Sequence, residues 1–417
     1  MTSRLSLVAA LLLSGCGLGT APRAVSQGAS AQTRFPAASF DAAGVSRQQL
    51  VVRLKGQTLP QSLTRQGRGA PRVTAKIQRL RALVVDAAPG TNLQDLLADL
   101  QRDKAVAYAA PTQLVQLERA VNDPRLAEQY SLKVGQVVEA WDVQMGVPEA
   151  VVAIIDSGID MNHPDLKAKI VPASYNVLDK NNNPADDHGH GTHCAGIAAA
   201  IADNAEGVAG VAPGVGIMSV KVIDAKGRGS DATIAEGIVY AADHGAKVMS
   251  MSLGLYKRSQ IIEDALQYAL DKDVVLCASA GNNNALNDPE SAPHLPSTYP
   301  GVIEVAATDV LDKKARFSNF GKTVAVAAPG VDIVSTLPTK AGQNTKPYGK
   351  MSGTSMASPY VAGLAALVRS QFPMMKQAEV KAHIQRTADD LGDQGFDPIF
   401  GHGRVNAFKA VSVAPQR

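Results

Sequence analysis

The chain has 417 residues, of which 45% are hydrophobic, and a formal net charge of +3. This length accommodates roughly two or three domains with a large core, which excludes an intrinsically disordered protein. Lysine and arginine are spread among apolar stretches without an accompanying set of aromatic residues, which argues against nucleic acid as a partner, and with only three cysteines no disulfide framework is expected.

The first residues have the pattern of an export signal. Arg4 precedes the apolar run 5–13, which is too short to span a bilayer, and small residues follow. The sequence LSGC, which ends at Cys16, resembles the bacterial lipobox and predicts lipidation of Cys16, with cleavage as an ordinary signal peptide as the alternative. Residues 1–16 are thus a predicted signal peptide and residues 17–46 a flexible tether. The protein is expected in the cell envelope or outside the cell, held at the membrane only by a lipid anchor.

Residues 47–120 are predicted to form a small α+β domain of the ferredoxin-like βαββαβ kind, because short strands alternate there with helical stretches. Thr91 or Asn92 is expected to cap its second helix. This segment carries 12 basic and 5 acidic residues, whereas residues 121–417 carry 26 and 32. The opposite net charges, +7 and −6, favour docking of the two parts.

From residue 121 to residue 417, buried apolar strands alternate with helices. This pattern predicts an α/β domain with a doubly wound, mostly parallel sheet covered on both faces. Functional side chains are then expected at the carboxyl ends of the strands. Cys194 and Cys277 fall in apolar stretches and are expected to be buried free thiols.

Three polar residues occupy such positions. Asp156 follows the strand VVAII, His190 directly precedes a helix of small residues, and Pro359 places the start of another helix near Ser355, where developing negative charge is favoured. Each residue has an ordinary structural reading as a turn former, a structural histidine or a helix cap. Together they supply the nucleophile, the base and the orienting carboxylate of a serine hydrolase.

Two alternatives compete with this hypothesis. An α/β-hydrolase esterase requires G-x-S-x-G and the order serine, acid, histidine, whereas residues 353–357 read GTSMA and the order here is Asp, His, Ser. A binding protein that keeps the fold without activity would be favoured by the loss of a catalytic residue, and all the expected ones are present.

The motifs AIIDSGID, HGHGTHCAGIAAA, MSLG, SAGN and SGTSMASP resemble those of the subtilisin-like serine proteases, and the similarity extends from residue 122 to residue 411. The resemblance is strongest to thermitase-like members. It implies that Asp156 orients the base His190 and that Ser355 is the nucleophile, while His193 is not the base. It also implies that the side chain of Asn282 and the backbone N–H of Ser355 form the oxyanion hole.

The resemblance further implies that a protein or peptide substrate lies as an extended strand, paired through backbone atoms and therefore with broad sequence tolerance. The small residues 278–281 imply a roomy primary pocket for apolar or aromatic side chains. Leu255 and the stretch HLPSTYP depart from the family pattern and leave fine specificity open. The implied substrate-binding residues are Gly227, Gly229, Ser252, Leu253, Gly254, Ala280 and Gly281.

By the same resemblance, the 47–120 domain is an intramolecular chaperone and inhibitor of a self-processing zymogen. Its terminal segment QLVQLERA would enter the cleft like a substrate, with cleavage near residues 119–121. The mature enzyme is expected to be a monomer.

The segment IADNAEGVAG interrupts a helix and predicts a structural calcium site, with a solvated surface loop as the alternative. The resemblance to thermitase-like members implies side-chain ligands from Asp123, Asp165 and Asn204. It adds the backbone carbonyls of Ile201, Glu206 and Val208.

Overall fold

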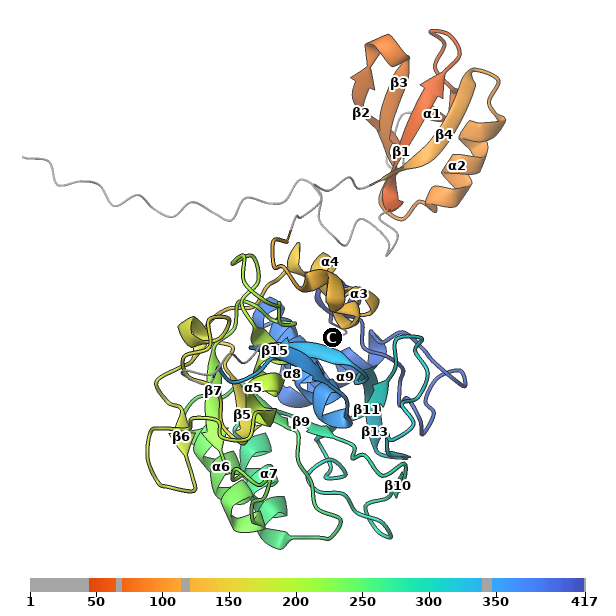
Figure 1. Cartoon of the computed structure of the whole chain (residues 1–417). Helices are drawn as coiled ribbons and strands as arrows, with labels where there is room; N and C mark the ends of the chain where they lie inside the picture. The colour runs from red at the N-terminus through yellow and green to blue at the C-terminus, as the bar shows by residue number, and fades with distance from the viewer. Residues whose placement is uncertain (1–44, 65–69, 114–120, 340–346, 416–417) are drawn as a thin grey trace, which may run out of the picture.

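The computed structural model describes residues 45–64, 70–113, 121–339 and 347–415 (Figure 1). The predicted signal peptide, the lipobox with Cys16 and most of the predicted tether lie outside these residues. The first strand begins at Val45, two residues before the predicted start of the small domain. Within the described residues, none of the helices has the length and apolar character needed to cross a bilayer.

Residues 45–113 form an antiparallel four-stranded sheet with two helices and a core of their own. The strands lie in the order β2-β3-β1-β4. Asn92, and not Thr91, caps α2, because its side-chain oxygen accepts a hydrogen bond from Gln94 N at 2.9 Å. The elements are β1 (Val45–Leu54), α1 (Gln61–Thr64), β2 (Arg72–Ile77), η2 (Gln78–Leu80), β3 (Ala82–Asp86), α2 (Leu93–Arg102) and β4 (Val106–Gln113).

The larger unit is built on a seven-stranded sheet in the order β13-β11-β9-β8-β5-β7-β6. Every neighbouring pair in this sheet is parallel, which confirms the predicted α/β class. The strands are β5 (Val152–Asp156), β6 (Tyr175–Asn176), β7 (Ile217–Lys221), β8 (Val248–Met251), β9 (Val275–Ser279), β11 (Ile303–Thr308) and β13 (Val324–Pro329).

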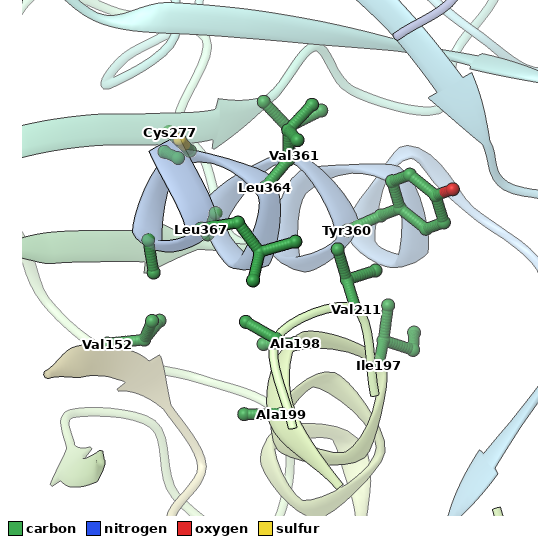
Figure 2. Close-up of a cluster of buried hydrophobic side chains, with 14 of the residues drawn as sticks. Val152, Ile197, Ala198, Ala199, Val211, Cys277, Tyr360, Val361, Leu364 and Leu367 are labelled. Atoms are coloured by element: carbon green, nitrogen blue, oxygen red, sulfur yellow. The ribbon is translucent and has the colours of Figure 1, made fainter. Parts of the chain in front are cut away.

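Helices cover both faces of this sheet, which explains why its long strands are mostly apolar and buried along their whole length. Along β5, Val152 and Ile154 join the core beneath α5 (His190–Ala199) and α8 (Thr354–Gln371). The alternate residues, Ala153 and Ile155, join the core beneath α6 (Asp231–Asp243) and α7 (Gln260–Asp271). Figure 2 shows the first of these cores, with Val152, Ala198 and Val211 on one side of α8 and Cys277 on the other.

Smaller elements complete the unit. They are η3 (Leu126–Glu128), α3 (Tyr130–Val134), α4 (Val137–Trp141), η4 (Lys167–Lys169), α9 (Gln377–Arg386), α10 (Ala407–Ser412), the parallel pair β10 (Leu286–Asn287) and β12 (Phe320–Gly321), and the antiparallel pair β14 (Ile333–Thr336) and β15 (Tyr348–Met351).

The close approach of α5 and α8 depends on small residues. A Cβ atom on Gly363 of α8 would stand 2.6 Å from the carbonyl oxygen of Ala198 in α5, so only glycine fits there. This packing fixes the two helices against each other and against β5. The first residue of α5, His190, is held beside the carboxyl end of β5, and Ser355 at the start of α8 is held beside Ser252, which follows β8.

Candidate active site

Asp156 and His190 are joined by hydrogen bonds at the end of β5. Both carboxylate oxygens of Asp156 lie near Nδ1 of His190, at 2.8 and 2.9 Å, and Oδ1 also accepts a hydrogen bond from Ser157 N at 2.7 Å. The Asp156 side chain is 4% exposed, whereas that of His190 is 23% exposed. The carboxylate therefore fixes the proton on Nδ1 and leaves the lone pair of Nε2 available as a base.

The electrostatic setting distinguishes His190 from the neighbouring His193. Burial is the largest single effect and disfavours the charged form of His190, but the charge and hydrogen bond of Asp156, together with the neighbouring Cys194, raise the pKa of His190 well above its ordinary value. His193 is fully buried, burial lowers its pKa to about 4, and its Nε2 lies 3.2 Å from the carbonyl oxygen of Gly349. These features are typical of a structural histidine and not of a catalytic base.

Ser355 lies in the first turn of α8, which begins at Thr354 after the N-cap Gly353. The helix thus starts one residue before the predicted Ser355, and Pro359, inside it, lacks the N–H that would bond to the Ser355 carbonyl. That carbonyl accepts instead from Ser252 Oγ at 2.9 Å and from Cys194 Sγ at 3.4 Å. The helix thus tolerates the proline, and Ser355 is anchored to two other elements.

Ser355 is half-buried. In this structure its hydroxyl donates to the carbonyl oxygen of Ser252 at 3.4 Å, and among the described residues the hydroxyl forms no hydrogen bond to His190. Cys194 lies between His190 and Ser355. Its sulfur is 3.9 Å from His190 Nδ1 and donates a hydrogen bond to the backbone carbonyl of Ser355.

Asn282 and the start of α8 border one small space. The side-chain oxygen of Asn282 accepts hydrogen bonds from the backbone N and the hydroxyl of Thr354, at 2.8 and 2.9 Å, which turns its Nδ2 donor away from Thr354. A Cβ atom on Gly353 would stand 3.4 Å from Asn282 Nδ2 and 3.6 Å from Ser355 N. Two hydrogen-bond donors, Asn282 Nδ2 and Ser355 N, therefore lie close to one space beside Gly353.

A cleft of about 660 Å³ runs past Asp156 and His190. It includes five of the predicted substrate-binding residues, namely Gly227, Gly229, Ser252, Leu253 and Gly254, but neither Ala280 nor Gly281. Arg228, which lies between the two predicted glycines, lines it as well, and so do His188 and Lys226, which the sequence did not indicate as site residues. Only their proximity in sequence to His190 and Gly227 could have indicated them.

Comparisons with known proteins agree with this arrangement. The model of the subtilase family (peptidase S8) matches residues 148–403. The chain belongs to the subtilase family. It is 43% identical to thermitase from Thermoactinomyces vulgaris, over 70% of this chain and 98% of thermitase. It is 41% identical to a thermophilic serine proteinase from Bacillus sp. (strain AK1), over 77% of this chain and 76% of that protein.

Among solved structures, the crystal structure of fervidolysin from Fervidobacterium pennivorans, a keratinolytic enzyme related to subtilisin, matches with a TM-score of 0.65 and 26% identity. The match covers 90% of this chain and 62% of fervidolysin. The chain is therefore a subtilisin-family serine endopeptidase with a subtilisin-like fold.

One feature of this subtilase departs from the expectation of a roomy primary pocket. The imidazole of His294, which is 3% exposed, faces both Gly254 and Gly281, and the hydroxyl of Tyr256 lies beside it. In the sequence, the small residues around Gly254 and Gly281 predict open space between these two segments. It does not show that a side chain from the HLPSTYP stretch fills the space between them.

The predicted calcium ligands of the subtilase gather around Asp165. Asp165 is fully buried, and its carboxylate accepts hydrogen bonds from Asn204 Nδ2 at 2.7 Å and Val208 N at 3.0 Å. Asp123 is 4% exposed, and its Oδ2 accepts from Asp203 N, while its Oδ1 has no partner among the described residues. Burial, with Asp165 and Asp203 nearby, raises the pKa of Asp123.

The backbone of the same loop is also compatible with a cation. Among the described residues, no donor forms a hydrogen bond with the carbonyl oxygens of Ile201, Glu206 or Val208. Two buried carboxylates, one with an unpartnered oxygen, together with three free carbonyls are the oxygen-rich ligand set that Ca²⁺ prefers. The residues present therefore fit the ion.

Both described cysteines are free and buried, as predicted. Cys277 lies in the core beneath α8, and burial raises the pKa of its thiol. Burial likewise raises the pKa of Cys194. Neither thiol has the low pKa of a reactive cysteine.

Proposed function

We propose that this subtilase hydrolyses peptide bonds through an acyl-enzyme formed on Ser355. The observation that carries the proposal is the paired hydrogen bond of Asp156 to His190, beside a serine at a helix N-terminus. The Ser355 oxygen attacks the peptide carbonyl carbon as its proton passes to Nε2 of His190. The imidazolium ion that forms is stabilised by Asp156.

The negative oxygen of the tetrahedral intermediate would accept hydrogen bonds from Asn282 Nδ2 and Ser355 N. When the intermediate collapses, the carbon–nitrogen bond breaks and His190 gives its proton to the leaving amine. A water molecule then loses a proton to His190 and attacks the ester. The second collapse releases the acid and returns the proton to Ser355.

Substrate polypeptides would lie in the cleft between residues 227–229 and 252–254. Glycine at 227, 229 and 254 leaves backbone atoms accessible, so an extended chain could pair with them as an added strand. Backbone pairing does not depend on side-chain identity. Broad specificity for proteins follows from it.

The experiment that tests this function is incubation of the purified protein with casein, with and without phenylmethylsulfonyl fluoride. We expect soluble peptides to be released and the reagent to stop their release. Casein left intact by the correctly processed protein would contradict the proposal. Hydrolysis unaffected by the reagent but stopped by a metal chelator at low temperature would indicate a different mechanism.

The pH dependence should report on His190. A general base acts only in its neutral form, and the pKa of His190 is raised well above 6.5 because the neighbouring Asp156 stabilises the cation. We therefore expect kcat/KM to rise with pH through a midpoint above 6.5. Measurement with a soluble peptide substrate from pH 5 to about 10 covers this range. A midpoint below 6.5 would show that Asp156 does not control the base.

Asn282→Ala should lower kcat and leave KM nearly unchanged, because its Nδ2 is expected to bond mainly to the transition state. The expected loss is about 10²- to 10³-fold, the magnitude known for the corresponding donor in subtilisin. Asn283→Ala is the matched control, since Asn283 is exposed and adjacent but uses only its backbone N–H in a described contact. Equal activity of the two variants would exclude Asn282 from the oxyanion hole.

The small unit of residues 45–113 is proposed to be the inhibitory propeptide of a zymogen. It has its own core, precedes the peptidase unit in the chain and has the opposite net charge. The segment proposed to enter the cleft, and most of the junction at 119–121, lie outside the described residues. Export and lipidation of Cys16 likewise stay predictions from the sequence.

Calcium is proposed as a structural ion held by the side chains of Asp123, Asp165 and Asn204 and the carbonyls of residues 201, 206 and 208. Its charge would offset the repulsion between the two buried carboxylates. Because Asp123 and the 201–208 loop are distant in sequence, the ion would join the N-terminal segment of the peptidase unit to α5.

A further inference from the structure

The wall of the primary pocket can be located from the reacting groups. Ser252 contacts Ser355 through two hydrogen bonds, at 2.9 and 3.4 Å, and Gly254 follows two residues later. Gly281 directly precedes Asn282. The substrate side chain next to the attacked carbonyl would therefore enter between Gly254 and Gly281.

This space is occupied by His294. A Cβ atom on Gly254 would clash with Nε2 of His294, and one on Gly281 would stand 3.1 Å from the same nitrogen and 2.9 Å from the Tyr256 hydroxyl. The rings of Tyr256 and His294 pack against each other with centroids 4.7 Å apart. The two glycines therefore make room for protein side chains, and the depth left for a substrate is reduced.

The imidazole of His294 is held rigidly from behind. Its Nδ1 lies 2.9 Å from Ser297 Oγ, which in turn lies 3.0 Å from the carbonyl oxygen of His294 and 3.2 Å from Oε1 of Glu304. Glu304 is fully buried, and Oε1 also accepts from Asn287. A ring fixed in this way cannot swing aside for a large substrate side chain without breaking a buried network.

The same network determines whether the other ring nitrogen of His294, Nε2, is a hydrogen-bond donor or an acceptor. Since the single hydroxyl proton of Ser297 is used by an acceptor oxygen, Nδ1 of His294 is the donor to Ser297, and Nε2 is left as an acceptor. Among the described residues, none donates to Nε2. Burial lowers the pKa of His294 to about 4, so the ring stays neutral in neutral and alkaline solution. A large apolar side chain would cover this acceptor without satisfying it.

We propose that His294 and Tyr256 shorten the primary pocket, so that this enzyme cleaves after short side chains such as alanine and serine in preference to aromatic ones. The inference rests on the proposed function and names the substrate class of that same site.

The test compares kcat/KM for succinyl-Ala-Ala-Pro-Xaa-p-nitroanilides in which Xaa is alanine, serine or phenylalanine. We expect the alanine and serine substrates to exceed the phenylalanine substrate by about tenfold or more in the wild type. In His294→Gly, kcat/KM for phenylalanine should rise by about tenfold or more, while the value for alanine changes by less than about threefold. The alanine substrate thus also reports whether the variant is folded and active.

Tyr256→Ala provides a second variant, because Tyr256 is 49% exposed and its replacement disturbs no buried network. It should shift the preference in the same direction by a smaller factor, whether or not His294→Gly folds. His244→Ala, which replaces a surface histidine at the end of α6, should leave the ratios unchanged.

A wild-type enzyme that digests casein but prefers phenylalanine would overturn the pocket inference alone. The same holds if neither His294→Gly nor Tyr256→Ala changes the ratio of phenylalanine to alanine. An enzyme that hydrolyses neither casein nor any of the peptides would overturn the proposed function, and the inference with it.

Discussion

Ser355→Ala is expected to lower kcat for protein substrates by about 10⁶-fold, the magnitude known for loss of the corresponding serine in subtilisin. The hydroxyl is needed for attack, and its only described hydrogen bond is a long one to the Ser252 carbonyl. The backbone contacts of Ser355 with Ser252 and Cys194 do not involve the hydroxyl and remain. The melting temperature should therefore be nearly unchanged.

Ser358→Ala is the matched control for this variant. Ser358 lies in the same helix, is fully buried, and its hydroxyl has no partner among the described residues. Activity should survive this change. If Ser355→Ala kept a tenth or more of the wild-type kcat, the assignment of the nucleophile would be wrong.

Processing of the zymogen should fail in the same variant. If the chain cuts itself near residues 119–121, Ser355→Ala protein made in a protease-free host should keep its propeptide, whereas Ser358→Ala protein should lose it. The mass of the purified chains measures this directly. Cleavage of Ser355→Ala at that junction would show that another protease is responsible.

Removal of calcium is expected to have the second large effect, on stability. A ligand present at a thousand times its dissociation constant stabilises the folded state by roughly 4 kcal/mol, and chelation should remove this contribution. The melting temperature is best measured in Ser355→Ala protein, in which self-digestion cannot shift the transition. In active enzyme, chelation should shorten the half-life on heating without changing the initial rate at low temperature.

Asp165→Ala should abolish the response to calcium because it removes the central carboxylate of the proposed ligand set. Asp142→Ala removes an exposed acidic side chain elsewhere and should respond like the wild type. If the melting temperature were the same in excess calcium and in chelator, or if Asp165→Ala still responded to calcium, the site assignment would fail.

The sequence predicted those features that depend on short segments. The apolar run of β5, the turn that follows it and the glycine-rich start of α5 place Asp156 and His190 by local rules, and the structure brings them within hydrogen-bonding distance. For the N-cap of α2, the sequence left open only the choice between Thr91 and Asn92, and the structure shows Asn92.

The features that could not be predicted depend on distant residues. Pro359 leaves the Ser355 carbonyl without its helical partner, and Ser252 and Cys194, more than a hundred residues away in sequence, supply the hydrogen bonds instead. The pocket is short because His294 fills space that two glycines leave open. Glycine in a sequence indicates where a side chain is missing but not which other side chain takes the space.

The central claim, that Ser355 is the nucleophile activated by His190, is tested most directly by peptide mapping after reaction with phenylmethylsulfonyl fluoride. The prediction is a single sulfonyl label on Ser355 that accumulates in step with the loss of casein hydrolysis, and no label in His190→Ala protein. A label on another residue, or complete inhibition with Ser355 unmodified, would contradict it.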